Sequence, residues 1–147
     1  MGIDIYAPII PYEGLGGIKL YSTREELKDI LEMDGVTKDK EPWGGAIQYY
    51  IEDKISLIFC VANDKLYKMS ALKGYKGKAF GKVGIGMSEE ELVEAEPSFV
   101  YDDFEEGWYT PKGIGAQTDV YTNKIAWLTI HIHEMEQDAR EFDKGNW

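Results

Sequence analysis

The chain has a single cysteine and no long apolar run. Cys60 is the one cysteine in 147 residues, so no disulfide can form within the chain, and its place in the apolar run ISLIFCVA predicts a buried, reduced thiol. No stretch approaches the roughly 18 apolar residues that are needed to cross a bilayer. The opening MGIDIYAPIIPYEG also lacks the basic region that begins a signal peptide. We therefore expect no membrane association and a cytoplasmic location.

Basic residues are scarce. The chain has 16 Lys and Arg against 27 Asp and Glu, which gives a formal net charge of −11 at pH 7. Proteins bind nucleic acid through Lys and Arg side chains that replace counterions on phosphates, so this balance argues against DNA or RNA as a partner. A basic protein partner fits better. The alternative is that the negative charge only keeps the protein dispersed.

Catalytic motifs are absent as well. The chain has no G-x-S-x-G nucleophile elbow, and the apolar surroundings of Cys60 favour an unreactive thiol. Carboxylates are so numerous that no one pair stands out as an acid and base couple. We therefore predict no enzyme activity, no catalytic residues and no cofactor, unless the fold brings several carboxylates together in one pocket.

Histidine is limited to His131 and His133. On a strand, this spacing would point both side chains to one face, as some metal sites require. Two ligands do not make a site, and a third would have to come from Glu134 or Cys60, so we predict no metal site. We expect instead a core face opposite an outward face. The core face holds Leu128, Ile130 and Ile132; the outward face holds Trp127, Thr129, His131 and His133.

The sequence does contain an apparent internal repeat. The segment GIKLYSTREEL resembles KVGIGMSEEEL at an offset of 65 residues (92 − 27), and the same offset takes Trp43 to Trp108. Beyond the tryptophans the offset grows to 70 and relates Asp53-Lys54-Ile55 to Asn123-Lys124-Ile125, as an insertion of about five residues would produce. Chance similarity of short apolar patterns is the alternative. We expect one domain, 1–147, with repeats at about 16–72 and 81–133 and a polar tail, 134–147.

Each copy predicts the same local structures. Thr23-x-x-Glu26 and Ser88-x-x-Glu91 are capping boxes, in which a hydroxyl and a carboxylate bond the first free amides of a helix. The second helix should stop before Pro97. Apolar runs joined at turns around Asp53, Asn63-Asp64 and Thr122-Asn123 predict antiparallel strands.

These local structures predict an α+β fold. Two tandem repeats, each a helix plus an antiparallel meander, should form one sheet with the helices packed on one side. The glycine-rich linker 73–86 should be an exposed crossover, and the tail should be a short polar helix that frays.

Charge is segregated on either side of the linker. Six lysines and no acids occupy 65–82, whereas nine acids and no bases occupy 89–106. Residues 99–109, here called the acidic strip, are also rich in aromatics. Aromatic residues provide most binding energy at protein interfaces and acids speed the encounter with a basic partner. The predicted contact residues are Tyr101, Asp102, Asp103, Phe104, Glu105, Glu106, Trp108, Tyr109, Trp127, His131 and His133. The alternative is that Phe99 and Tyr101 face the core and the acids are only solvated.

The doubled pattern resembles a known structural unit. Its glycine-bearing strand before [Ser/Thr]-x-x-Glu-Leu and its later Lys-Ile-x-x-[Leu/Ile] strand are similar to the tandem repeat of the β-lactamase inhibitor protein and the single repeat of the SmpA/OmlA (BamE-like) lipoproteins, over about 16–132. The resemblance implies the fold only. Those families lie outside the cytoplasm, and this chain lacks their signal peptide, lipoprotein cysteine and disulfides, so function does not transfer.

In character the chain also resembles the small acidic immunity proteins of bacterial toxin systems. That resemblance implies a non-catalytic inhibitor that covers the active surface of a basic toxin. The competing hypothesis is a small-ligand or metal-binding module that uses the concave face of the sheet with His131 and His133.

Overall fold

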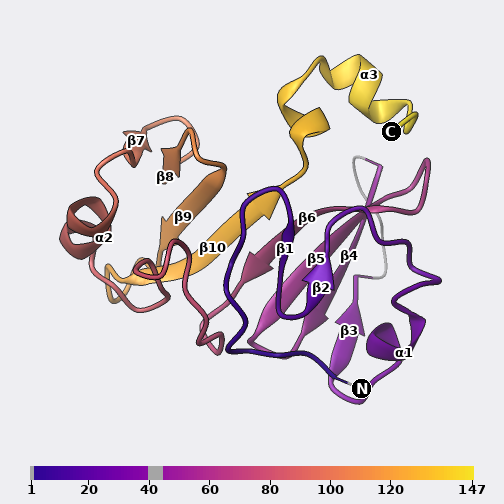
Figure 1. The fold of residues 1–147 in the computed structure, drawn as a ribbon, viewed down its shortest axis with the longest axis horizontal. Helices are drawn as coiled ribbons and strands as arrows, with labels where there is room; N and C mark the ends of the chain where they lie inside the picture. The colour runs from indigo at the N-terminus through magenta and orange to yellow at the C-terminus, as the bar shows by residue number, and fades with distance from the viewer. Residues whose placement is uncertain (1, 40–44) are drawn as a thin grey trace.

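The main feature of the fold is one antiparallel sheet (Figure 1). The computed structural model describes residues 2–39 and 45–147. Within these residues the sheet has eight strands in the order β3-β4-β5-β6-β10-β9-β8-β7. The strands are β3 (Val36–Lys38), β4 (Ala46–Ile51), β5 (Ile55–Cys60), β6 (Leu66–Ala71), β7 (Val100–Asp102), β8 (Gly107–Thr110), β9 (Ile114–Thr118) and β10 (Ile125–His131). The first four and the last four strands therefore form the two halves of the sheet, which join where β6 pairs with β10. The fold is mainly β with a few short helices, consistent with the α+β class.

The predicted hairpin turns are confirmed. The turns between β4 and β5, β5 and β6, and β9 and β10 fall at the expected places. Each contains a residue in the left-handed region, namely Glu52 (φ 50°), Asp64 (φ 63°) and Asn123 (φ 58°). Asp and Asn tolerate this conformation better than most residues because their short side chains bond to nearby backbone.

Alternation along the strands gives the sheet two different faces. On one face Ile55, Ala71, Leu128 and Ala116 lie side by side on four adjacent strands and are fully buried. We call the opposite side the open face; on it the registers align Gln48, Tyr50, Lys68, Ser70, Gln117, Trp127 and Thr129. These side chains are partly or fully exposed. The predicted core face and outward face are confirmed along β10, which ends at His131 and does not include His133.

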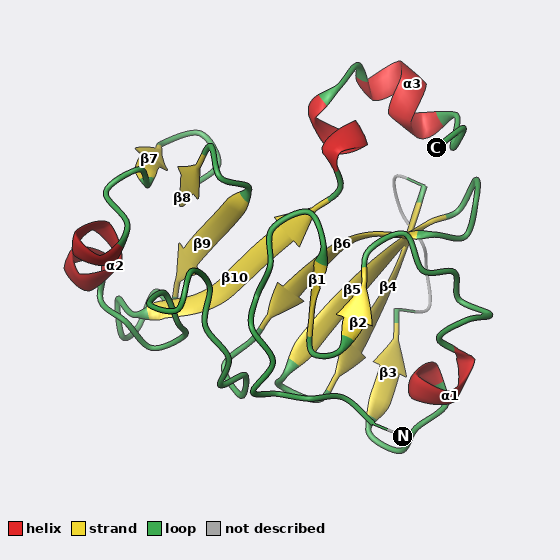
Figure 2. Ribbon diagram, viewed as in Figure 1, coloured by secondary structure: helices red, strands yellow, loops and turns green. Residues whose placement is uncertain are grey.

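Irregular chain, rather than a layer of helices, covers most of the buried face. The hairpin of β1 (Gly14–Leu15) and β2 (Ile18–Lys19) buries Leu15 and Ile18 there, and Figure 2 shows it lying over the first half of the sheet. Helix α2 (Glu89–Ala95) buries only Leu92, and α1 (Lys28–Leu31) has no buried residue. The predicted helical layer is thus much reduced.

The linker 73–86 is part of this cover, so its prediction as an exposed crossover is wrong. Tyr75, Ala79 and Val83 are buried in the core. Gly77 is required by close packing, because a Cβ at this position would lie 2.0 Å from the carbonyl oxygen of Ala7. The glycines here allow the linker to pack against the N-terminal segment.

The two capping boxes have different outcomes. The Ser88 hydroxyl accepts from the Glu91 amide and the Glu91 carboxylate accepts from the Ser88 amide, and α2 follows and ends before Pro97, as predicted. Thr23 and Glu26 make the same reciprocal bonds. Residues 24–27 nevertheless form turns, and α1 spans only four residues.

The tail is helical but not simply polar. It contains a 3₁₀ turn, η1 (His133–Glu136), and α3 (Ala139–Asp143). Phe142 stacks on Trp147 with ring centroids 5.3 Å apart and meets the Tyr67 ring edge-on at 5.0 Å. The Asn63 amide also donates to the carbonyls of Gly145 and Trp147. Aromatic contacts therefore fix a segment that was predicted to be polar.

Two further sequence predictions can be checked against the strand order. Cys60 is buried in β5, as predicted. Ile55 and Ile125, which the 70-residue offset relates, begin strands that hold different places: β10 is central, whereas β5 is one strand away from the centre. Trp43 lies outside the described residues. No helix in the described ranges is long and apolar enough to cross a membrane.

Candidate functional site

The acidic strip lies at one edge of the sheet and is largely exposed. Phe99 is buried in the core, whereas Tyr101 on the edge strand β7 is 43% exposed. The alternative in which both rings face the core therefore holds for Phe99 only. Phe104, at the tip of the turn between β7 and β8, is 92% exposed. A large apolar side chain so placed is available for contact with another molecule.

Local hydrogen bonds give the β7–β8 turn its shape. The Asp102 carboxylate accepts from the amides of Phe104 (2.9 Å) and Glu105 (3.2 Å), and Glu106 adopts a left-handed φ of 55°. Asp102 is thus used in the turn itself. The turn projects Asp103, Phe104, Glu105 and Glu106 into solvent, where all four are exposed.

Trp108 contributes mainly to the structure. Its indole Nε1 donates to Glu89 Oε2 at 2.7 Å, which ties β8 to the first turn of α2. The ring of Tyr101 packs edge-on against it with centroids 5.3 Å apart. Trp108 is therefore a support for Tyr101 more than a free contact residue, although the sequence predicted it as a partner contact.

A groove of about 430 Å³ unites parts of the chain that are distant in sequence. We call it the acidic groove. It brings together four of the predicted contact residues: Tyr101, Glu105, Glu106 and Trp127. The opposite wall is the β9–β10 turn, and the other residues that matter here are Lys73, Gln117, Asp119, Val120 and Tyr121.

The sequence prediction missed the β9–β10 turn residues. Val120 and Tyr121 are 82% and 93% exposed. Two adjacent apolar or aromatic residues inside the polar turn segment TDVYTN are unusual, because such turns are normally polar. This departure is the signal that could have identified them.

Charge in the acidic groove is only partly neutralised. Lys73 forms an ion pair with Asp119, and this ammonium, helped by the Tyr121 amide, holds the pKa of Asp119 below its usual value. Among the described residues, no cation forms an ion pair with Glu105 or Glu106. Burial, and then the nearby charges of Glu105 and Asp102, raise the pKa of Tyr109. The groove thus presents two uncompensated carboxylates.

Two more hollows continue from the acidic groove along the open face. One, of about 290 Å³, shares Trp127 and Gln117 with the groove and extends to Tyr50. The next, of about 300 Å³, reaches Tyr109 and His131 and again includes Gln117. The predicted contacts Tyr109, Trp127 and His131 consequently lie on one continuous concave surface.

The two histidines lie at one end of this surface. Strand β10 ends at His131 and His133 belongs to η1, so the two do not share a strand as predicted. Tyr12 stacks on His133 (centroids 3.7 Å apart) and meets His131 edge-on (5.7 Å). Its hydroxyl donates to Glu136 at 2.9 Å, and burial and this carboxylate raise the pKa of Tyr12. In the part of the chain that the structure describes, no three His, Cys, Asp or Glu side chains converge as metal ligands.

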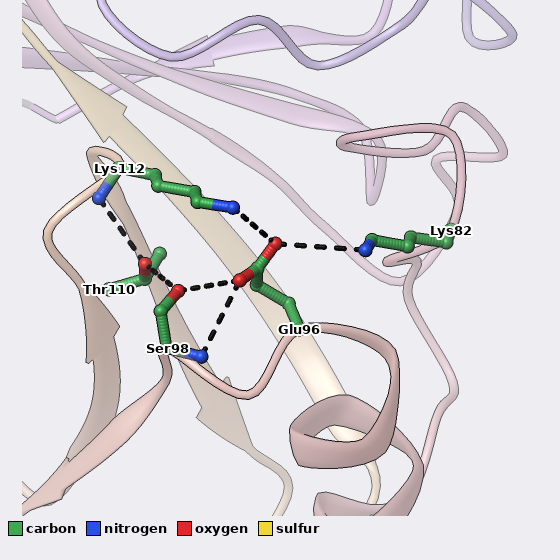
Figure 3. Close-up of polar contacts among 5 residues, drawn as sticks. All are labelled: Lys82, Glu96, Ser98, Thr110 and Lys112. Atoms are coloured by element: carbon green, nitrogen blue, oxygen red, sulfur yellow. Dashed lines mark hydrogen bonds and ion pairs between the residues drawn. The ribbon is translucent and has the colours of Figure 1, made fainter.

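A buried carboxylate cluster elsewhere was not predicted. Figure 3 shows Glu96 between Lys112 (2.9 Å) and Lys82 (3.8 Å), with its second oxygen accepting from the Ser98 hydroxyl at 2.7 Å. Ser98 in turn shares a hydrogen bond with Thr110. Lys112 and Ser98 lower the pKa of Glu96 to about 2.

This cluster has a structural rather than a catalytic role. A carboxylate with so low a pKa is a poor general base near neutral pH, and both of its oxygens are already engaged. The cluster links the linker, the end of α2 and the β8–β9 turn. Its role is therefore to hold the second half of the sheet in place.

Comparison of the chain with protein-family models, with curated proteins and with solved structures finds no match.

Proposed function

We propose that this protein is a non-catalytic binding protein that covers a basic protein partner, in the manner of an immunity protein that blocks a toxin. One observation carries the proposal: the acidic groove combines exposed aromatic rings with two carboxylates that have no cation partner in the described residues. Exposed aromatic side chains are costly on an isolated protein and productive at an interface.

The two kinds of residue have different parts in binding. Tyr101, Phe104 and Trp127 supply apolar area that loses contact with water when a partner covers it, and such residues dominate interface energies. Glu105 and Glu106 contribute mainly to the rate of encounter and to the choice of a basic partner, because their field attracts positive charge before contact.

The open face extends the surface available to the partner. It continues from the groove past Trp127 and Gln117 to Tyr109 and His131. A partner that follows this path would contact both halves of the sheet, so we place it across the β6–β10 junction as well as on the acidic strip. We also propose a cytoplasmic location, which the buried thiol of Cys60 supports.

The test is binding of the purified chain to the protein encoded next to it in the genome. Titration calorimetry should detect a complex whose affinity falls as NaCl rises, since exposed charges are screened. Replacing Asp102, Asp103, Glu105 and Glu106 together by Ser should weaken it at least tenfold.

The matched control removes four exposed acids at the opposite end of the sheet, and these are Glu25, Asp29, Glu32 and Asp34. This control has the same net charge as the test variant but keeps the acidic strip. Absence of a complex, or equal loss of affinity in the two variants, would reject the proposed surface.

A small-ligand site is the second candidate, favoured by the hollow of about 300 Å³ beside His131 and Met135. Such a volume lies at the lower end of the range for small-molecule sites. Its metal-binding version predicts that Zn²⁺ titration differs between the wild type and the His131→Ala, His133→Ala variant. Identical heats in the two proteins would exclude it.

We also propose that the two halves of the sheet arose by duplication of one unit, over about 16–72 and 81–133. The strand registers support this: residue spacing is identical in two series of cross-strand partners. These series are Tyr49, Leu57, Met69 and Trp108, Ala116, Leu128. In this register Tyr49 rather than Trp43 would correspond to Trp108, an offset of 59 residues (108 − 49), so the offsets of 65 and 70 residues read from the sequence do not hold along these strands. A sequence profile of relatives that fails to align the two halves at this spacing would reject the duplication.

A further inference from the structure

We propose that the acidic groove binds the guanidinium group of an arginine side chain. The natural occupant, an arginine on the basic partner, rests on the proposed function, but the site itself is defined by this chain alone. Three aromatic and two acidic residues line the groove, and they come from β7, the β7–β8 turn, the β9–β10 turn and β10.

The rings provide faces for a cation. Tyr101, Tyr121 and Trp127 line the groove, and each is between 43% and 93% exposed. A cation within about 6 Å of such a ring is attracted by its negative face, most strongly for tryptophan. These lining residues come from three segments of the chain, so a cation in the groove would meet aromatic residues of more than one segment.

The carboxylates provide the charge. Asp119 is already paired with Lys73, which leaves Glu105 and Glu106 to accept hydrogen bonds from an incoming group. A guanidinium is favoured over an ammonium for two reasons. Its planar fork donates to carboxylates in pairs, and its weak hydration lets it stack on aromatic rings.

The volume of the groove indicates how much of the partner chain it can hold. About 430 Å³ exceeds the space that one side chain fills, so the groove also has room for neighbouring residues of an extended segment. The Gln117 side chain, which lines this groove and both neighbouring hollows, can donate to or accept from the backbone of that segment.

The test uses the full chain and three capped tripeptides: acetyl-Gly-Arg-Gly-amide, its lysine counterpart, and its citrulline counterpart, which has nearly the shape of arginine without the charge. The readout is the indole N–H signal of Trp127 in ¹⁵N NMR spectra, assigned by loss of one signal in Trp127→Phe. The arginine peptide should shift this signal saturably, and at least threefold more tightly than the lysine peptide. The citrulline peptide should leave it in place.

Two charge variants locate the site. Glu105→Gln with Glu106→Gln should weaken arginine-peptide binding about tenfold, the effect of losing one charge-assisted contact. Glu90→Gln with Glu94→Gln removes the same charge from exposed residues that lie outside the acidic strip and do not line the groove, and should change binding less than twofold. Unchanged spectra outside the groove will show that both variants are folded.

Three results would overturn the inference. The first is a Trp127 signal that does not move. The second is binding of the citrulline or the lysine peptide as tight as that of the arginine peptide, and the third is an equal loss of binding in the two charge variants. These failures are separable from failure of the proposed function. If the peptide does not bind but the genome-neighbour protein does, the arginine site is wrong and the binding role stands. If the peptide binds but the genome-neighbour protein does not, the arginine site stands and the proposed partner is wrong.

Discussion

Tyr75→Phe should destabilise the fold through the N-terminal segment. The Tyr75 side chain is only 2% exposed, and burial raises its pKa, so its hydroxyl stays protonated. The hydroxyl accepts from the amide of Gly16 at 2.8 Å and donates to the carbonyl of Ala7. It therefore joins the linker to two points of the segment that covers the buried face.

The magnitude follows from the burial of these two groups. Gly16 is buried and its amide would be left without a partner, which costs about 1–3 kcal/mol. Ala7 is only partly buried, so water can replace most of the lost bond to its carbonyl. A total of about 2–3 kcal/mol results, a large share of the roughly 5–15 kcal/mol that stabilises a typical domain.

Urea unfolding followed by tryptophan fluorescence will measure this loss. With a slope of about 2 kcal/mol per molar, the midpoint should fall by about 1–1.5 M with the slope unchanged. Tyr67→Phe is the matched control, because within the described residues the Tyr67 hydroxyl makes no hydrogen bond although its ring is partly buried. That variant should remain within about 0.5 kcal/mol of the wild type. Equal stability of the two variants would refute this account of Tyr75.

Three further changes test other parts of the structure. The pKa of Glu96 is lowered from 4.5 to about 2, so this carboxylate adds stability that is present above pH 4.5 and lost as the pH falls toward 2. Glu96→Gln should therefore lower the urea midpoint at pH 7 and flatten the fall of the midpoint between pH 4.5 and 3. Parallel curves of midpoint against pH for the variant and the wild type would contradict this. Ser88→Ala removes the cap of α2 and should cost about 1 kcal/mol by the same assay, whereas no loss would show that α2 does not depend on its cap. Leu57→Ala should cost about 2–5 kcal/mol because Leu57 is fully buried, while Val61→Ala, at a half-exposed position, should cost under about 0.5 kcal/mol, and similar losses at both would place the core elsewhere.

Features governed by neighbouring residues were predictable from the sequence. The capping box at Ser88, the end of α2 before Pro97 and the left-handed turn residues Asp64 and Asn123 all depend on hydrogen bonds or dihedral angles within a few positions. The two faces of β10 followed from simple alternation. Even here the capping box at Thr23 does not start a helix directly: residues 24–27 form turns and α1 begins only at Lys28.

The candidate site depended on contacts between distant residues. The charge and the aromatic content of the acidic strip were visible in the sequence. Its meeting with Trp127 and Tyr121 was not, because that requires the strand order β10-β9-β8-β7. The same is true of Glu96, whose partners Lys82 and Lys112 lie on either side of it along the chain and carry no recognisable spacing.

The sequence by itself thus determined the hairpin turns, the capped start of α2, the acidic surplus and the two faces of β10. The tertiary structure alone decided which polar side chains share a surface, that the linker through Tyr75 belongs to the core, and which carboxylates keep an uncompensated charge. The physical reason is the range of the interactions. Turns and helix caps depend on hydrogen bonds between residues close in sequence. A groove depends on how segments that are distant in sequence pack once the strands of the whole sheet have paired.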